Sequence, residues 1–412
     1  MRVVEPHEFK GVKHPKKKRK GRIGLRFIIV LIIFAYVGAS LIRPAPAVNA
    51  SVRLPEVTKA REASLLWPTY GQSAVGAVGY GVLGTNGVQK PLPIASVAKV
   101  MTALAILKAK PLSPGQPGPM ITFTQEDVDY YYQTVALGGS NTPVELGVEI
   151  SQYEALQALL LPSSNNMAYT LSRWAYGSEE AYVQFANNFA KTLGMTSTTI
   201  TDASGFSAET VSTASDLTKL AVNAMDSPVI AEIARQPEAV IPVAGTIYNV
   251  NNLLGRNNIV GLKTGNTAEA GGCFMAAAIK EVNGQRVVAV SVIMGAANRQ
   301  LAMQDSVPLV NSVLDNFEPV TIVTANQTVG SYSASAQNSV NARVKNSLVG
   351  VRWAGQDVSP EIRLNKLNGA IHKGTEVGSV KATIGRTTLE SPITVDGPLA
   401  EISWLQKLIP RF

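Results

Sequence analysis

The chain has 412 residues, 46% of them hydrophobic, which is the composition of a folded protein large enough for two domains and a short accessory segment. Its formal net charge is +8, but residues 1–26 hold ten of the 37 basic residues and two of the 29 acidic ones, so the rest of the chain carries 27 of each sign. Nothing in this electroneutral body indicates a phosphate-binding face, and we expect no nucleic-acid partner.

An apolar run directly follows the basic segment. Phe27–Ile42 holds 16 residues without a charge and is bounded by Arg26 and Arg43. This length is marginal for a membrane span and slightly long for the core of a secretory signal, so residues 27–43 are predicted as either a signal peptide or a transmembrane anchor. The long basic segment favours the anchor. In both cases we expect residues 1–26 to stay in the cytoplasm and the body to be exported, either held at the outer face of the plasma membrane or released from it.

Residues 44–64 contain three prolines and few bulky apolar residues, which predicts a linker. From residue 65 to residue 318, segments with strand and helix periodicity alternate, which predicts an α/β domain. The expected strands are 74–83, followed by a turn at 84–87, and a hairpin of 272–279 and 286–294; the expected helices are 96–109, 153–176 with a break at Pro162, 179–193, 215–225 and 304–317.

The composition changes after Phe317. Residues 319–398 consist of short β-branched segments separated by Gly, Asn and Ser turns, the pattern of a small all-β sandwich module. The last segment, residues 399–412, carries Trp404 and Phe412 and is expected either to form a short interfacial helix or to pack on the β-module.

Cysteine and histidine are scarce. Cys273 is the sole cysteine of the sequence, so no internal disulfide can form, and its side chain is expected to be buried. The three histidines are His7, His14 and His372, which leaves the predicted α/β domain without one. This excludes a Ser/His/Asp or Cys/His catalytic set there, and a metal site built on histidine or cysteine. We expect no metal and no cofactor.

A Ser-x-x-Lys pattern occurs once, as Ser96-Val-Ala-Lys99 at the start of the helix predicted over 96–109. A spacing of three places both side chains on one helix face, so the lysine amine can reach the serine hydroxyl. A desolvated lysine can act as the base that a serine nucleophile needs, and the helix N-terminus favours a developing oxyanion. The alternative is an N-capping serine beside a solvated lysine. The apolar surroundings of Lys99 favour the functional interpretation, because a buried amine needs a polar partner.

Ser163-Ser-Asn165 follows an apolar segment that ends at Pro162. Its hydroxyl can relay a proton from the lysine to a leaving amine, and its amide can hold the lysine and the substrate backbone. Ser164 and Asn166 offer the same pattern in a second register. Taken alone, the segment can also be a polar turn after Pro162.

Lys263-Thr-Gly265 also occurs once, and the preceding apolar residues 259–262 predict a strand. A cation and a hydroxyl can bind a carboxylate, and a glycine allows close approach of a substrate backbone. The tripeptide means little in isolation. The three motifs in this order, with gaps of 67 and 100 residues from Ser96 to Ser163 and from Ser163 to Lys263, carry the functional prediction together.

The chain resembles the serine-type D-alanyl-D-alanine carboxypeptidases, the low-molecular-mass penicillin-binding proteins of peptidase family S11. The resemblance extends beyond the motifs to surrounding blocks, among them 93–104, 159–168, 202–206 and 261–271. It implies a penicillin-recognising DD-peptidase and β-lactamase-like catalytic domain over 65–318, and more loosely a C-terminal β-sandwich. It also implies a peptidoglycan stem peptide as substrate and β-lactam antibiotics as covalent inhibitors.

The resemblance implies catalytic roles for the first two motifs. Ser96 attacks the D-Ala-D-Ala carbonyl, and Lys99 acts as its base. Ser163 and Asn165 assist proton transfer and positioning.

It also implies that the third motif binds the substrate. Lys263 and Thr264 hold the terminal carboxylate, Gly265 lets the peptide approach, and backbone N–H groups of Ser96 and Asn266 hold the oxyanion.

Four other functions have to be weighed against a carboxypeptidase. A DD-endopeptidase or a transpeptidase uses the same motifs and differs only in the bond cut or the acyl acceptor. A class A β-lactamase needs a glutamate on an intervening loop, and no Glu-x-x-x-Asn pattern lies at a suitable distance after Ser163. A catalytically silent wall-binding scaffold has no use for a buried lysine. The oligomeric state is left open.

Overall fold

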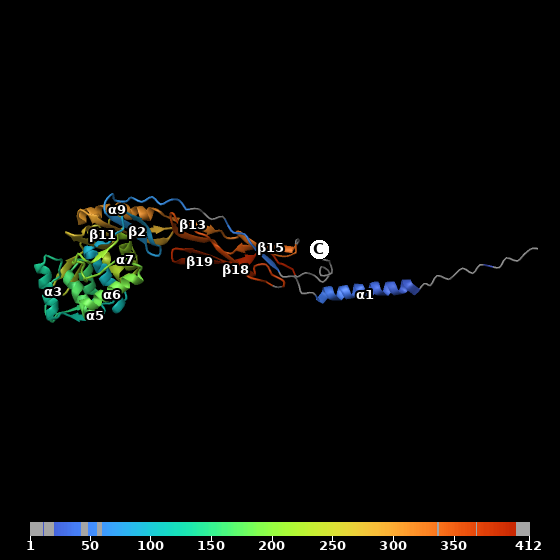
Figure 1. Ribbon diagram of the computed structural model, residues 1–412, viewed down its shortest axis with the longest axis horizontal. Coiled ribbons are helices and arrows are strands. Elements are labelled where there is room, and N and C mark those ends of the chain that lie inside the picture. The colour runs from blue at the N-terminus through green and yellow to red at the C-terminus, as the bar shows by residue number, and fades with distance from the viewer. Residues whose placement is uncertain are drawn as a thin grey trace, which may run out of the picture.

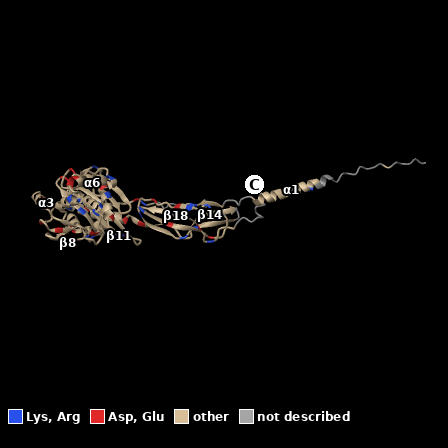
Figure 2. Cartoon of the chain, turned by 90° about the horizontal axis from the view of Figure 1, so that it is seen from below, with Lys and Arg blue, Asp and Glu red and all other residues tan. Residues whose placement is uncertain are grey.

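The computed structural model describes residues 11, 20–42, 48–55, 60–335, 338–367 and 369–400. Most of the basic segment 1–26 and most of the expected C-terminal helix 399–412 lie outside these residues. Figure 1 shows an elongated molecule with an α/β body at one end, a β-module in the middle and helix α1 at the other end. Basic and acidic residues are interspersed over the body and the β-module (Figure 2), as an electroneutral composition requires.

Helix α1 spans Lys20–Ile42 and therefore begins before the apolar run. Within it, Gly24–Ile42 is long and apolar enough to cross a membrane, and its large apolar side chains are exposed, as Phe27 is at 70%. A membrane anchor and a signal sequence share these properties.

A five-stranded antiparallel sheet forms the centre of the body. Its strands in spatial order are β10 (Ile259–Thr267), β11 (Gly271–Val282), β12 (Gln285–Ala296), β2 (Gln72–Ala77) and β3 (Gly81–Asn86). Alternate residues of β11 enter different cores: Met275 packs under the helical layer, and Phe274 packs under α9 (Arg299–Asp315). Both faces of the sheet are covered, which explains the nearly continuous apolar strands. The predicted hairpin of 272–279 and 286–294 is confirmed.

The first hairpin differs from its prediction. The chain turns at Val78–Tyr80 rather than at 84–87, so the strand predicted over 74–83 is two strands, β2 and β3. Gly79 and Gly81 adopt φ values of +84° and +74°, the left-handed conformation that tight turns need and that glycine alone enters without strain. Because apolar residues lie on both sides of these glycines, the sequence pattern gave no indication of a turn here.

Helices cover the face of the central sheet opposite α9 and carry the first two motifs. The predicted helices are confirmed, with shifted ends: α9 begins at Arg299 instead of residue 304, because Asn298 caps it through Leu301 N. The helices are η1 (Ala95–Ala98), α2 (Lys99–Ala109), α3 (Gln125–Ala136), α4 (Gln152–Leu160), α5 (Asn165–Tyr176), α6 (Glu179–Thr192), α7 (Ala214–Asp226) and α8 (Pro228–Ala234). The short strand pairs are β4 (Leu92–Pro93) with β7 (Val211–Ser212), β5 (Met120–Thr122) with β6 (Glu149–Ser151), and β8 (Glu238–Ile241) with β9 (Gly245–Tyr248).

The C-terminal part is an all-β module, as predicted. One sheet has the order β1-β14-β15-β19-β18-β17, and β13 pairs with β16 separately. The strands are β13 (Phe317–Val323), β14 (Thr328–Ser335), β15 (Asn338–Val344), β16 (Leu348–Trp353), β17 (Glu361–Leu364), β18 (Glu376–Ile384) and β19 (Thr387–Val395).

The segment expected as a linker, residues 44–64, contributes a strand to the β-module. Its residues Asn49–Val52 form β1, which pairs with β14 and extends the sheet of the module. An edge strand offers unpaired N–H and C=O groups, so a passing extended segment can add to it without an apolar pattern of its own. Asn49, Ala50 and Ser51 therefore gave no strand signal in the sequence.

Body and module share an apolar cluster. Phe317, Val351 and Trp353 of the β13–β16 pair pack with residues of α9 and the central sheet, and Tyr80 lies edge-on against Phe317 with ring centroids 5.0 Å apart. This shared apolar cluster joins the body to the β-module near the hairpin turn at residues 78–80.

Candidate active site

Ser96 lies at the start of the buried helix α2, on the short turn η1. The preceding residue, Ala95, has φ +49°, a strained conformation for a residue with a side chain, and such strain is concentrated at functional sites. The Ser96 side chain is half-buried, while Val97 and Ala98 behind it are buried. The serine is therefore held at the surface of a rigid core.

Lys99 is fully buried and turns its amine toward Ser96. Lys99 Nζ donates hydrogen bonds to Ser96 Oγ at 2.9 Å, to Asn165 Oδ1 at 2.7 Å and to the Ser204 carbonyl at 2.8 Å. Burial lowers the pKa of Lys99 from 10.5 to about 7, against the opposing charge of Asp202. The lowered pKa favours the neutral amine relative to an ordinary lysine.

Ser163 and Asn165 approach the lysine from the break between α4 and α5. Ser163 adopts φ +68°, and this left-handed turn lets the chain leave α4 and begin α5 at Asn165. Asn165 contacts Lys99, and Lys263 Nζ donates to Ser163 Oγ at 2.8 Å. The segment after Pro162 therefore bridges two lysines.

Ser164 and Asn166, the second register of this motif, contact Thr142 instead of a lysine. Asn166 Oδ1 accepts a hydrogen bond from Thr142 N at 3.0 Å, Asn166 Nδ2 donates one to the Thr142 carbonyl at 2.9 Å, and Ser164 Oγ bonds Thr142 Oγ1. These side chains fasten the 139–142 loop beneath α5. The structure therefore places Ser163 and Asn165, not Ser164 and Asn166, beside the lysines.

Lys263 and Thr264 lie on β10, the edge strand next to η1. Lys263 is buried, and its pKa is well below its ordinary value because of burial and then the charges of Lys99 and Arg299. Its amine also donates to the Thr264 carbonyl at 3.1 Å. A carboxylate bound here would favour the charged form of Lys263.

Gly265 allows β10 to approach the serine. A Cβ at this position would lie 3.0 Å from the Ile94 carbonyl oxygen and 3.3 Å from Ser96 N. The prediction assigned this glycine to the approach of the substrate, whereas in the structure it is the η1 backbone that needs the space. Asn266 is exposed, and its Oδ1 accepts a hydrogen bond from Arg299 N at 3.1 Å, which ties β10 to the start of α9.

Asp202 and Ser204 complete the site without having been assigned a role from the sequence. Asp202 Oδ2 accepts from Ser204 N, Ser204 Oγ and Phe206 N, at 2.7–3.1 Å. This closed loop presents the Ser204 carbonyl to Lys99. The Asp-x-Ser spacing at 202–204 is typical of a loop that folds on its own side chain, and it was the available signal.

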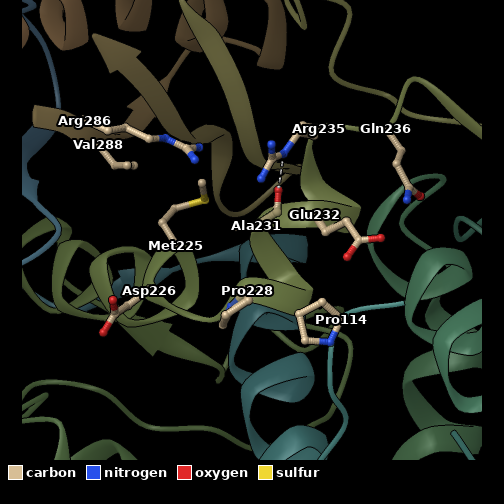
Figure 3. A pocket seen from close by; sticks show the side chains of 10 residues that line it. All are labelled: Pro114, Met225, Asp226, Pro228, Ala231, Glu232, Arg235, Gln236, Arg286 and Val288. Atoms are coloured by element: carbon tan, nitrogen blue, oxygen red, sulfur yellow. Dashed lines mark hydrogen bonds between the residues drawn. The ribbon is translucent and has the colours of Figure 1, made fainter. Parts of the chain in front are cut away.

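Cavities flank the site. One of about 130 Å³ includes Asn165, Tyr169 and Phe206, and another of about 370 Å³ runs from Phe206 along the end of β10. A larger cavity of about 650 Å³, shown in Figure 3, is lined by Arg235 and Arg286 but by none of the motif residues. Within the described ranges no cluster of three His, Cys, Asp or Glu side chains could hold a metal ion.

The family model for D-alanyl-D-alanine carboxypeptidases matches residues 77–298, more than half of the chain. The chain belongs to this family. The D-alanyl-D-alanine endopeptidase of Escherichia coli is 32% identical over 201 residues, which are 47% of this chain and 62% of that protein, so the match falls short of two thirds of its length. The Bacillus subtilis D-alanyl-D-alanine carboxypeptidase DacF is 25% identical over 76% of this chain and 81% of its own.

Solved structures of related proteins share the fold across both parts. Penicillin binding protein 6B from Escherichia coli superimposes with a TM-score of 0.57 at 20% identity, over 84% of this chain and 99% of that one. A peptidoglycan synthesis regulatory factor, PBP3, from Streptococcus pneumoniae gives 0.58 at 20% identity, over 80% and 98%. The predicted fold, a DD-peptidase domain followed by an all-β module, is confirmed.

Proposed function

We propose that this protein is a serine D-alanyl-D-alanine carboxypeptidase that removes the terminal D-alanine from peptidoglycan stem pentapeptides. The observation that carries the proposal is the contact of 2.9 Å between a buried lysine with a pKa of about 7 and the hydroxyl of Ser96. A base with a pKa near the working pH is the most effective proton acceptor. The family of the chain supports the choice of substrate.

Acylation uses the first motif. The neutral amine of Lys99 accepts the proton of Ser96 Oγ as that oxygen forms a bond to the carbonyl carbon of the penultimate D-alanine. The N–H groups of Ser96 and Asn266 hold the oxyanion of the tetrahedral intermediate. The C–N bond then breaks, and Ser163 passes a proton to the departing amine, leaving an ester on Ser96.

Substrate binding and deacylation use the remaining residues. Lys263 and Thr264 hold the terminal carboxylate, while Asn165 positions Lys99 and the peptide. A water molecule then attacks the ester carbon and Lys99 takes one of its protons; as the bond between that carbon and Ser96 Oγ breaks, Lys99 returns the proton to Ser96 Oγ and the shortened peptide leaves as a carboxylic acid. β-Lactams acylate the same serine but lose no leaving group, so they remain bound as covalent inhibitors.

A fluorescent penicillin tests this proposal. We expect labelling of the wild-type protein and complete loss of labelling in Ser96→Ala, with circular dichroism showing that the variant is folded. D-alanine release from a pentapeptide should disappear in the same variant. A folded wild-type protein that never labels would instead support the wall-binding scaffold.

An endopeptidase is the second candidate, because the relatives at 32–33% identity from Escherichia coli and Pseudomonas aeruginosa are named D-alanyl-D-alanine endopeptidases. A transpeptidase and, with less support, a class A β-lactamase share the same chemistry. Release of D-alanine from a pentapeptide, compared with cleavage of a crosslinked dimer, separates the first two. Faster attack on the dimer would overturn the carboxypeptidase.

We further propose that α1 is a retained anchor, with residues 1–26 in the cytoplasm and the body outside. The β-module would then hold the active site away from the membrane. Cleavage of α1 as a signal peptide, with release of the body, is the alternative. Alkaline extraction of membranes tests the choice: an anchored protein stays in the pellet with its N-terminus intact.

A further inference from the structure

The cavity of about 130 Å³ opens directly beside the proposed catalytic machinery. Its wall includes Asn165, whose Oδ1 is bonded to Lys99. The Asn165 Nδ2 group has no hydrogen-bond acceptor among the described residues. The cavity therefore shares Asn165 with the proposed catalytic machinery.

Glu179 supplies the cavity with a negative charge. It is the first residue of α6 and is half-buried, and its Oε1 accepts a hydrogen bond from Ala203 N at 3.1 Å. Burial raises the pKa of this carboxyl, and the charge of Asp202 adds to the effect. In the part of the chain that the structure describes, no cation pairs with Glu179. A positively charged group entering the cavity would relieve an uncompensated anion.

Arg173, on the neighbouring helix α5, pairs with carboxylates other than Glu179. Arg173 Nη2 lies 2.6 Å from Asp127 Oδ2, and Arg173 Nε lies 3.6 Å from Glu126. Tyr130 donates its hydroxyl hydrogen to Glu126 at 2.8 Å. The charge of Arg173 is thus neutralised by its own partners, and the carboxylate of Glu179 stays available.

Aromatic side chains line the same cavity. Tyr130, Tyr169 and Phe206 form part of its wall, and the Tyr130 and Tyr169 rings lie 5.3 Å apart. Aromatic rings around one carboxylate favour an organic ammonium group over a strongly hydrated metal ion, because cations bind to ring faces while their alkyl stem packs on them.

The orientation of the peptide in the active site decides which of its side chains can enter the cavity beside Glu179. Lys263 and Thr264 are proposed to bind the terminal carboxylate; Lys263 contacts Ser163, and Asn165, two residues further along the chain, contacts Lys99. Phe206 lines both this cavity and the one along the end of β10, where an extended peptide can pair with the strand edge. A peptide lying there can direct a side chain past Phe206 toward Glu179.

We propose that Glu179 and its aromatic neighbours bind the protonated amine of the side chain that directly precedes the two D-alanines of the substrate. The site thereby prefers stem peptides with a free amino group at that residue. This inference rests on the proposed function, since it deepens the choice of substrate for the same site.

Two matched peptides test the inference. One carries lysine before D-Ala-D-Ala, and the other carries Nε-acetyl-lysine, which keeps the stem and loses the charge. We expect kcat/KM to be about tenfold higher for the free amine, the effect of one charge-assisted hydrogen bond, with most of the difference in KM. In Glu179→Gln the ratio should fall to about one, and in Glu179→Lys it should reverse. Glu180→Gln, an exposed carboxylate one residue away, should keep the wild-type ratio.

A second measurement separates this inference from the carboxypeptidase itself. Both peptides are used to slow the labelling of Ser96 by a fluorescent penicillin, which reports occupancy of the site whether or not D-alanine leaves. Stronger competition by the amine peptide without D-alanine release would uphold the amine site and contradict the carboxypeptidase. Equal competition by both peptides in the wild type, or an unchanged ratio in Glu179→Gln, would overturn the amine site even if D-alanine is released.

Discussion

Lys99 and Lys263 are buried in one site, and burial together with the charge of Lys99 lowers the pKa of Lys263. Each contacts a different serine: Lys99 Nζ lies 2.9 Å from Ser96 Oγ, and Lys263 Nζ lies 2.8 Å from Ser163 Oγ. Two full charges so close together in a low dielectric repel each other. This repulsion disfavours the state in which both amines are charged. One neutral amine can then serve as a base while a substrate carboxylate restores the charge on the other.

The rate of acylation should rise as the pH increases through about 7. The reason is that Lys99 accepts a proton only when neutral, and its pKa is lowered to about 7. Stopped-flow labelling with a fluorescent penicillin between pH 5.5 and 8.5 measures this. In Lys99→Arg, which stays protonated, acylation should drop by about 10³-fold. A wild-type rate that falls from pH 6 to pH 8 would rule out a neutral lysine base.

The free energy of unfolding should also rise with pH above 7. Lys99 has a pKa of about 7 when folded and near 10.5 when unfolded, so the unfolded chain binds more protons between these values. The cost of its burial is complete below pH 7 and is relieved as the pH rises toward 10.5. Urea unfolding at pH 7 and pH 8 should show wild type gaining up to about 1.4 kcal/mol over Lys99→Met. The exposed Lys280→Met variant should track wild type at both pH values.

Gly265→Ala should impair acylation more than stability. The new Cβ would lie 3.0 Å from a backbone oxygen of Ile94, so β10 or the Ser96 turn has to shift by a few tenths of an ångström. A displacement of this kind in a site for covalent chemistry costs about 10–100-fold in rate. Gly84→Ala is the matched control, because its Cβ would meet nothing closer than 3.4 Å in the same sheet. Equal labelling rates for both variants would contradict the tight approach.

Asn166→Ala should lower stability strongly. Its amide makes two buried hydrogen bonds with the Thr142 backbone, at 2.9 Å and 3.0 Å, and removal leaves a buried N–H and C=O without partners. We expect a loss of about 2–3 kcal/mol in urea unfolding. The control Asn223→Ala removes a bond to the Lys219 carbonyl on the exposed side of α7 and should cost less than about 1 kcal/mol.

The apolar contact, rather than the ion pair, should hold the β-module to the body. Arg386 bonds both oxygens of Asp226, but their side chains are 60% and 42% exposed, so Asp226→Asn should cost less than about 1 kcal/mol. Phe317→Ala removes a ring from the shared cluster and should cost about 3–5 kcal/mol. Thermal unfolding measures both, and a larger loss in Asp226→Asn than in Phe317→Ala would reverse this ranking.

The sequence by itself determined the nature of the chemistry. A single Ser-x-x-Lys at the start of an apolar helix and the absence of histidine from residues 15 to 371 predict a lysine base, and this prediction needs no knowledge of the fold. Helix 96–109 and the hairpin 272–294 were predictable because their burial follows local periodicity. The first hairpin was not, since apolar residues continue through the turn at Gly79, and β1 was not, since Asn49, Ala50 and Ser51 show no apolar alternation.

Tertiary structure alone decided which groups meet. Ser163 and Lys263 are 100 residues apart, and only the packing of the α4–α5 break against β10 brings them to 2.8 Å. Nothing local distinguishes Ser163 from Ser164, yet one bonds a lysine and the other bonds Thr142. The pKa of Lys99, the Ser204 carbonyl and the unpaired Glu179 also follow from burial among distant residues, because desolvation depends on what surrounds a side chain in space and not on its neighbours in the chain.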